Sequence, residues 1–224
     1  MKKPVELLKK SCREFGIFLY NQNKIKHYEI TQSGEYGIRM RLGDLGTVKF
    51  YINNKLEIKI VNENLAENVF EEILILWEIF RKGNKYLKGI HIFVDGSFMN
   101  GKVGYGFLII KDGIVLKKSF GKLGDEYSRY FNLRNVLGEI KAIIESIEFC
   151  MKEGLTEIHI HYDYEGLKKW ANLEWKAKNE ITHQYQEYIL DASKKLKIIW
   201  LKEKAHSDSM LNAFADRLAK KALK

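Results

Sequence analysis

The sequence predicts an α/β protein in which a mixed five-stranded sheet with flanking helices follows a small α+β domain. From residue 89 onward, three strand-like segments are followed by strands that alternate with helical segments. In the first part, short strand-like segments lie between two amphipathic helical segments. Polar, lysine-rich residues separate the two parts. We therefore expect a small domain at 1–82, a linker at 83–88 and a larger domain at 89–224.

The first domain begins with a helix, because Pro4 stands where a first helical position is expected and an amphipathic pattern runs to about residue 15. Strand-like segments follow, separated by turn residues such as Ser33-Gly34. A second helix is expected over 65–80. The strand-like segments cover residues 17–20, 26–31, 36–41, 47–51 and 56–61.

The second domain is expected to open with a strand over 90–95. Strands over 104–111 and 114–120 flank Asp112-Gly113, which is a strong hairpin signal. A helix over 135–152 ends before Gly154. The order βββαβααβα predicts an antiparallel meander followed by strands joined through helices. The remaining elements are a strand at 157–162, helices at 164–175 and 179–196, a strand at 197–202 and a helix at 209–223.

Charge and composition restrict the function. The net charge of +9 is shared, with 16 Lys and Arg against 11 Asp and Glu in residues 1–88 and 22 against 18 in residues 89–224. This excess favours a polyanionic partner, with a merely solvated lysine-rich surface as the alternative. Cys12 and Cys150 lack the spacing of a disulfide framework or a structural zinc site. Glutamates interrupt the longest apolar segment, and the first residues lack a signal-peptide pattern, so we expect a cytoplasmic protein without a membrane span.

Four carboxylates occupy informative places. Asp95 and Asp163 end predicted strands, Glu139 lies early in the first helix of this domain, and Asp216 lies in the last helix. Ligands of open α/β sheets bind at the carboxyl ends of the strands, where these side chains would converge. Converging carboxylates need cations, and Mg²⁺, or Mn²⁺ in its place, suits such ligands. Two such ions about 4 Å apart are the usual apparatus of phosphodiester cleavage.

Each carboxylate alone also has a simpler interpretation. Asp95-Gly96 fits a plain turn, and Glu139 fits a solvated helix residue. Asp163 fits an N-cap, and Asp216 fits a surface ion pair with Arg217 or Lys220. Their joint placement, on the right elements and in the right order, favours a shared site.

Four segments resemble the motifs of type 1 ribonuclease H in its bacterial form. The resemblance covers about residues 89–224, and four motifs in order make it specific. The segments are Val94-Asp95-Gly96-Ser97, Arg134-Asn135-Val136-Leu137-Gly138-Glu139, Tyr162-Asp163-Tyr164-Glu165-Gly166 and Ala205-His206-Ser207 with Asn212 to Lys220.

The resemblance implies an endonuclease that hydrolyses the RNA strand of RNA–DNA hybrids and leaves 5′-phosphate and 3′-hydroxyl ends. It implies that Asp95 bridges two metal ions. Glu139 and Asp163 would complete one metal site, and Asp216 the other. Other nucleases or polynucleotidyl transferases of this fold, and a non-catalytic hybrid-binding module, are the alternatives.

The resemblance also implies roles for other residues. His206 would assist proton transfer or product release, with a loop histidine of no function as the alternative. Gly96, Ser97 and Asn135 match positions that contact the nucleic-acid backbone. Many members carry a second asparagine where this chain has Val136, so one substrate contact is expected to be missing.

The chain has no room for the lysine- and tryptophan-rich protrusion with which some members grip the substrate. A shorter basic and aromatic stretch around Trp170 and Trp175 replaces it, which predicts a weak grip in the catalytic domain. Domain 1–82 would then raise the local concentration of the catalytic domain on the hybrid. A protein partner for this domain is the alternative. Its candidate contacts are Lys24, Lys26, Arg39, Arg41, Lys49, Lys55 and Lys59.

Overall fold

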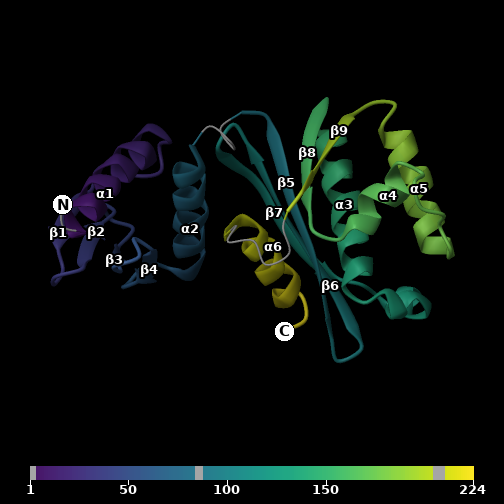
Figure 1. Cartoon of the computed structure of the whole chain (residues 1–224), viewed down its shortest axis with the longest axis horizontal. Helices are drawn as coiled ribbons and strands as arrows, with labels where there is room; N and C mark the ends of the chain where they lie inside the picture. Colours follow the sequence, from purple (N-terminus) through teal and green to yellow (C-terminus); the bar gives the residue numbers. More distant parts are fainter. Residues whose placement is uncertain (1–3, 84–87, 204–209) are drawn as a thin grey trace. The chain divides into compact units, whose positions relative to one another are not determined.

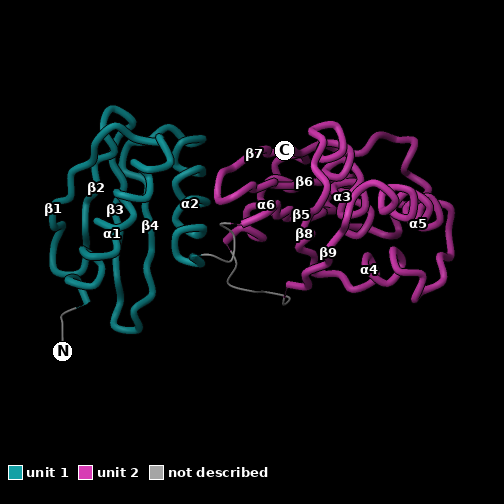
Figure 2. Tube along the Cα trace, turned by 90° about the horizontal axis from the view of Figure 1, so that it is seen from above, with its two compact units in different colours: residues 1–83 teal, residues 84–224 magenta. Residues whose placement is uncertain are grey.

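The computed structural model describes residues 4–83, 88–203 and 210–224. The chain divides into two compact units, residues 1–83 and 84–224, which Figure 2 distinguishes by colour. No helix in the described ranges has the length and apolar character needed to cross a membrane.

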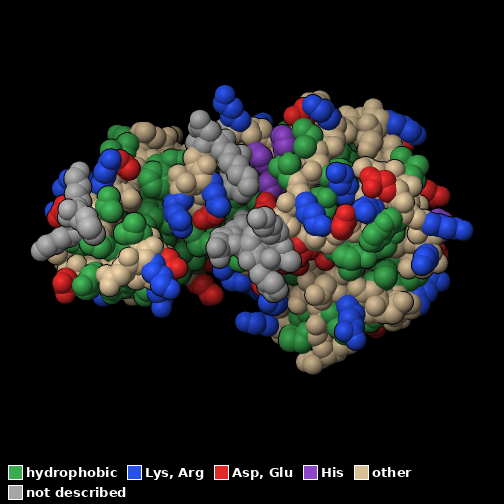
Figure 3. Space-filling model, viewed as in Figure 1, with side chains coloured by type: hydrophobic (Ala, Val, Ile, Leu, Met, Phe, Trp, Pro, Cys, Tyr) green, Lys and Arg blue, Asp and Glu red, His purple; other side chains and the backbone are tan. Residues whose placement is uncertain are grey.

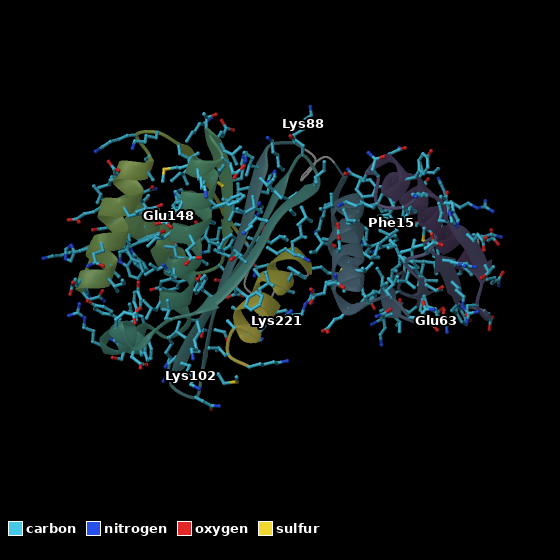
Figure 4. The ribbon with its side chains drawn as sticks, turned by 180° about the vertical axis from the view of Figure 1, so that it is seen from behind. Phe15, Glu63, Lys88, Lys102, Glu148 and Lys221 are labelled. Atoms are coloured by element: carbon cyan, nitrogen blue, oxygen red, sulfur yellow. The ribbon has the colours of Figure 1, made fainter. Side chains whose placement is uncertain are left out.

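Unit 1 is a four-stranded antiparallel sheet with two helices, as predicted for this region. The strands follow one another in the order β1-β2-β3-β4. Both helices pack on one sheet face, because the rings of Phe15 and Trp77 lie 6.2 and 5.0 Å from that of Phe50. Figure 4 labels Phe15 in the interior of this unit. The elements are α1 (Pro4–Asn21), β1 (Glu29–Gln32), β2 (Gly37–Arg41), β3 (Thr47–Ile52), β4 (Ile58–Asn62) and α2 (Glu67–Lys82).

The prediction of a strand over residues 17–20 in unit 1 is wrong. Residues 17–20 form the last turn of α1 rather than a strand. The buried side chains of α1 explain this, since Leu8, Cys12, Phe15 and Leu19 repeat at helical spacing and are fully buried. Packing of this stripe outweighs the local preference of the segment for a strand.

Unit 2 contains the predicted mixed five-stranded sheet, in the order β7-β6-β5-β8-β9. β5, β6 and β7 are antiparallel, whereas β8 pairs parallel with β5 and β9. Helices α3, α4 and α5 lie on one side of the sheet, and α6 lies on the other (Figure 1). The strands are β5 (Ile90–Met99), β6 (Lys102–Lys111), β7 (Ile114–Lys122), β8 (Glu157–Tyr162) and β9 (Lys197–Lys202). The helices are η2 (Asp125–Leu133), α3 (Asn135–Lys152), α4 (Glu165–Ala171), α5 (Glu180–Ala192) and α6 (Met210–Lys221).

Glycines bring the two central helices close to the sheet. A Cβ on Gly138 of α3 would clash with the carbonyl oxygen of Gly104 and lie 2.8 Å from the Cα of Gly96. On the other side, a Cβ on Gly106 of β6 would lie 2.6 Å from the backbone nitrogen of Ala219 in α6. Both contacts lie beside Asp95, which pairs with Gly106. The backbones of α3 and α6 therefore approach the sheet on either side of this aspartate.

Candidate active site

Asp95 lies within β5 and does not end it, contrary to the prediction. β5 continues through Gly96 and stays paired with β6 as far as Met99 opposite Lys102. The Asp95 carboxylate is partly buried, and its Oδ1 accepts a hydrogen bond of 2.7 Å from the backbone N–H of Gly96. Asp95 is thus held by a strand that is hydrogen-bonded along its whole length.

Asp163 immediately follows β8 and is exposed. β8 pairs parallel with β5, and Phe93 stands opposite His161 in this register. Continuing this register by two residues, to the position just after β8, would place Asp163 next to Asp95. The charge of Asp163 is accordingly among the causes that raise the pKa of Asp95.

Glu139 is the most deeply buried of the four carboxylates. It lies in the second turn of α3 and is 4% exposed. Burial, followed by the charges of Asp163 and Asp95, raises the pKa of Glu139 well above its ordinary value. Its Oε2 is buried and has no hydrogen-bond partner among the described residues.

Asp216 approaches from α6, on the other side of the sheet, and is partly exposed. Its Oδ2 lies 2.7 Å from the Nζ of Lys220, one helical turn away. Burial, the charge of Asp163 and the charge of Asp216 raise the pKa of Asp95 to about 7. The structure therefore brings the four predicted carboxylates into one electrostatically coupled group.

This group fits a hard divalent cation. Burial, and then the charges of the neighbouring carboxylates, raise the pKa values of Asp95 and Glu139, and a bound cation would oppose both effects. The unpartnered Oε2 of Glu139 is an oxygen ligand of the kind that Mg²⁺ prefers. In the described ranges, no three acidic, histidine or cysteine side chains lie close enough together to hold a metal ion as they stand. Ion binding would draw these mutually repelling carboxylates closer together.

The predicted substrate-contacting residues lie beside this group. Gly96 is pressed against the carbonyl oxygen of Asn135, which a Cβ on Gly96 would meet. Asn135 is exposed at the first position of α3, whereas Ser97 is 8% exposed within β5. His206 lies outside the described residues.

A pocket of about 570 Å³ is lined in part by Tyr164, the residue that follows Asp163. The predicted basic and aromatic stretch forms much of its wall, and the ring of Trp170 lies 5.7 Å from that of Tyr164. The sequence interpretation missed Leu133, which ends η2, and Tyr164, which follows Asp163. The lining residues are Leu133, Tyr164, Trp170, Glu174, Trp175, Lys176, Lys178, Asn179 and Thr182.

Unit 2 is similar in sequence to known proteins. The family model described as RNase H matches residues 88–224. A ribonuclease H of Caldanaerobacter subterraneus subsp. tengcongensis is 27% identical over 147 residues, covering 60% of this chain and 91% of the relative. A ribonuclease H of Thermoanaerobacter is 28% identical over 103 residues, covering 42% of this chain and 66% of the relative.

Two solved structures show the same fold as unit 2. RNase H1 of Halobacterium salinarum has a TM-score of 0.50 at 17% identity, covering 60% of this chain and 96% of that chain. The N-terminal RNase H domain of a Mycobacterium tuberculosis protein has a TM-score of 0.50 at 22% identity, covering 61% of this chain and 94% of that chain.

Proposed function

The chain belongs to the ribonuclease H family, and we propose that unit 2 hydrolyses the RNA strand of RNA–DNA hybrids by two-metal-ion catalysis. The observation that carries this proposal is the electrostatic coupling of Asp95 in β5, Asp163 immediately after β8, Glu139 in α3 and Asp216 in α6. A merely structural cluster would gain stability from basic partners. Here Asp95 and Glu139 instead have raised pKa values, as expected of a site that is completed by cations.

Each carboxylate has a distinct part in the proposal. Asp95 would hold both ions, Glu139 and Asp163 would complete one site, and Asp216 the other. Divalent cations bound there would activate the attacking water and stabilise the leaving oxygen. Lys220 would limit the negative charge of Asp216 until an ion binds. His206 would move a proton or assist product release, and the products would carry 5′-phosphate and 3′-hydroxyl ends.

Recognition of the hybrid would combine three surfaces. Asn135, with Gly96 and Ser97, would contact the nucleic-acid backbone near the carboxylates. The pocket lined by Tyr164 offers tryptophan and tyrosine rings together with Lys176 and Lys178. Such a combination suits a sugar-phosphate strand and its bases.

Unit 1 would supply the third surface. Its helices cover the sheet face that carries Phe50, which leaves the opposite face for a ligand. Arg39 stands opposite Lys49, and Tyr51 stands opposite Lys59, on that second face. Arg41 also lies there. Glu63 contacts both Arg39 and Lys49 at 2.8 Å, so this face holds ordered cations beside a tyrosine.

The direct test is cleavage of end-labelled substrates in Mg²⁺, in Mn²⁺ and in EDTA. The substrates are an RNA–DNA hybrid, duplex RNA, duplex DNA and single strands. We expect cleavage of the RNA only in the hybrid, and loss of cleavage in EDTA and in Asp95→Asn. Asp191→Asn, an exposed α5 carboxylate paired with Lys194, is the matched control and should cleave normally.

Other outcomes would replace the proposal. Cleavage that does not require a 2′-hydroxyl in the cut strand would indicate another nuclease of this fold. Hybrid binding without metal-dependent turnover would indicate a non-catalytic binding module.

A further inference from the structure

The sheet face of unit 1 that the helices leave uncovered carries a tyrosine ring packed against a glycine. Tyr51 in β3 stands opposite Gly37 in β2, so both residues belong to the same face. A Cβ on Gly37 would lie 3.1 Å from Cε1 and 3.2 Å from Cδ1 of Tyr51. The ring therefore takes up the space that a side chain at position 37 would need. Tyr51 is still 38% exposed, so part of its ring remains open to a ligand.

Basic side chains lie beside this ring in two directions. Arg41 and Arg39 face outward from β2, roughly 7 Å apart, and the Tyr51 ring takes the next place in this line. On the neighbouring strands, Lys49 stands opposite Arg39, and Lys59 stands opposite Tyr51. Cations thus lie both along β2 and across the sheet toward β4. Figure 3 shows Lys and Arg side chains, in blue, on both units in this view.

Carboxylates on or beside this face reduce its positive charge only in part. They are Glu29 in β1, Glu57 in the turn before β4 and Glu63 after β4. Glu63 lies 2.8 Å from both Arg39 and Lys49 and holds these two cations in place. Lys59, the cation opposite the ring, has no ion pair with any described residue. An anionic group next to the ring would therefore find a cation that is free to pair with it.

We propose that this face binds single-stranded nucleic acid, with one unpaired base stacked on Tyr51 and the neighbouring phosphates paired with Lys59 and Arg41. An exposed aromatic ring among basic side chains suits a single strand, because every base has an aromatic face and the backbone is anionic. The proposal rests on the function proposed above and deepens it. The ligand would be an unpaired stretch of a strand that continues into the hybrid cleaved by unit 2.

The ring and the cations should contribute differently to binding. Phosphates are present on paired and unpaired strands alike, so Arg41 and Lys59 would attract both. Bases inside a duplex are already stacked on their neighbours, whereas unpaired bases can turn out and stack on an aromatic side chain. Tyr51 should therefore favour substrates that carry an unpaired stretch. Because stacking does not depend on base identity, this preference should vary little with sequence.

The test measures binding of the full chain by fluorescence anisotropy in EDTA, which prevents cleavage. The probes are a blunt RNA–DNA hybrid and the same hybrid with an unpaired RNA or DNA extension of about ten nucleotides. We expect the wild type to bind the extended hybrid about fivefold more tightly, or better. Tyr51→Leu should lose this preference and bind the blunt hybrid like the wild type. Tyr51→Phe keeps the ring and should keep the preference. Tyr20→Leu, which changes an exposed tyrosine of α1, is the matched control and should also keep it.

Two further measurements make the outcome decisive. Thermal unfolding checks that Tyr51→Leu is folded, and Tyr51→Thr is a second variant without the ring whose new residue favours strands. Cleavage of the blunt hybrid in Mg²⁺ is measured in parallel, and its absence in the wild type would overturn the proposed function of unit 2. With cleavage intact, equal affinity of the wild type for both hybrids would overturn only the present proposal. So would an unchanged preference in folded Tyr51→Leu or Tyr51→Thr, or loss of the preference in Tyr51→Phe.

Discussion

Lys220 lies one helical turn after Asp216 on α6, and its Nζ is 2.7 Å from the Asp216 carboxylate. This ammonium group is paired with an Asp216 oxygen that would otherwise be available to a divalent cation. It also lowers the pKa of Asp95, against the larger effects of burial and of Asp163. Lys220 therefore competes with metal ions while reducing repulsion in the metal-free site.

Replacing this lysine should tighten metal binding. At pH 8, which lies above the pKa of about 7 of Asp95, Lys220→Gln should lower the Mg²⁺ concentration for half-maximal hybrid cleavage. An exposed pair of this spacing contributes about 0.3–0.5 kcal/mol, which corresponds to roughly a twofold change. Lys194→Gln removes a similar exposed pair with Asp191 on α5 and is the control. A higher Mg²⁺ requirement in Lys220→Gln would show that the lysine supports the site instead.

Stability without metal should fall as the pH rises, because burial and the charge of Asp163 raise the pKa of Asp95 from 3.8 to about 7. The folded state then holds this proton more tightly than the unfolded state. The contribution of the protonated Asp95 to the free energy of unfolding is complete below about pH 4 and is lost as the pH rises through about 7. The loss is on the order of 2–4 kcal/mol, and the raised pKa of Glu139 acts in the same direction.

Asp95→Asn isolates this effect, since an amide stays neutral at every pH. In EDTA at pH 8 the variant should be more stable than wild type by urea unfolding, with little difference at pH 4. Saturating Mg²⁺ should reverse the order, because only the wild type binds the ions fully. Asp191→Asn should follow the wild type throughout. A variant that is less stable in EDTA at both pH values would contradict this account of Asp95.

Close contact between α3 and β5 should be essential to the position of Glu139. In Gly138→Ala, the new Cβ would meet the carbonyl of Gly104 and the Cα of Gly96, and backbone atoms cannot easily move aside. We expect a loss of about 1–3 kcal/mol from overpacking, with at least a tenfold loss of cleavage. Urea unfolding and hybrid turnover measure the two effects.

Gly124→Ala is the matched control. The three atoms nearest to its Cβ would all belong to the side chain of Glu126, which is flexible and can turn away. This variant should keep both stability and activity. Wild-type turnover in Gly138→Ala would show that α3 can shift without displacing Glu139.

Strong local signals predicted much of unit 2. Asp112 and Gly113 adopt positive φ angles of 50° and 79°, as the hairpin signal requires. The helix 135–152 and the strand 197–202 have the predicted bounds, because their patterns and end signals agree. The order of these elements was enough to predict that the four carboxylates would converge.

Long-range pairing and packing explain the parts that were not predicted. Gly96-Ser97 has the local pattern of a turn, yet β6 supplies hydrogen-bonding partners that extend β5 to Met99. The deep burial of Glu139 depends on how closely α3 approaches the sheet at Gly138. The contact between His91 and His161 arises from the register of β5 and β8. These residues are 70 positions apart, so no short sequence pattern indicates that they meet. Such features depend on tertiary contacts rather than on short patterns.

The open sheet face of unit 1 should affect substrate affinity but not the chemical step. Arg41 and Lys59 lie exposed on this face, and no ion pair of either is present among the described residues. The double variant Arg41→Gln, Lys59→Gln should raise the KM for the hybrid several-fold while kcat stays the same. The slope of log affinity against log salt concentration should decrease in magnitude by up to about 2, since each lost phosphate contact removes roughly one unit.

Lys10→Gln, on the exposed surface of α1, is the control and should leave both KM and the salt dependence unchanged. Unchanged KM and salt dependence in the double variant would exclude this face from hybrid binding and favour a protein partner for unit 1.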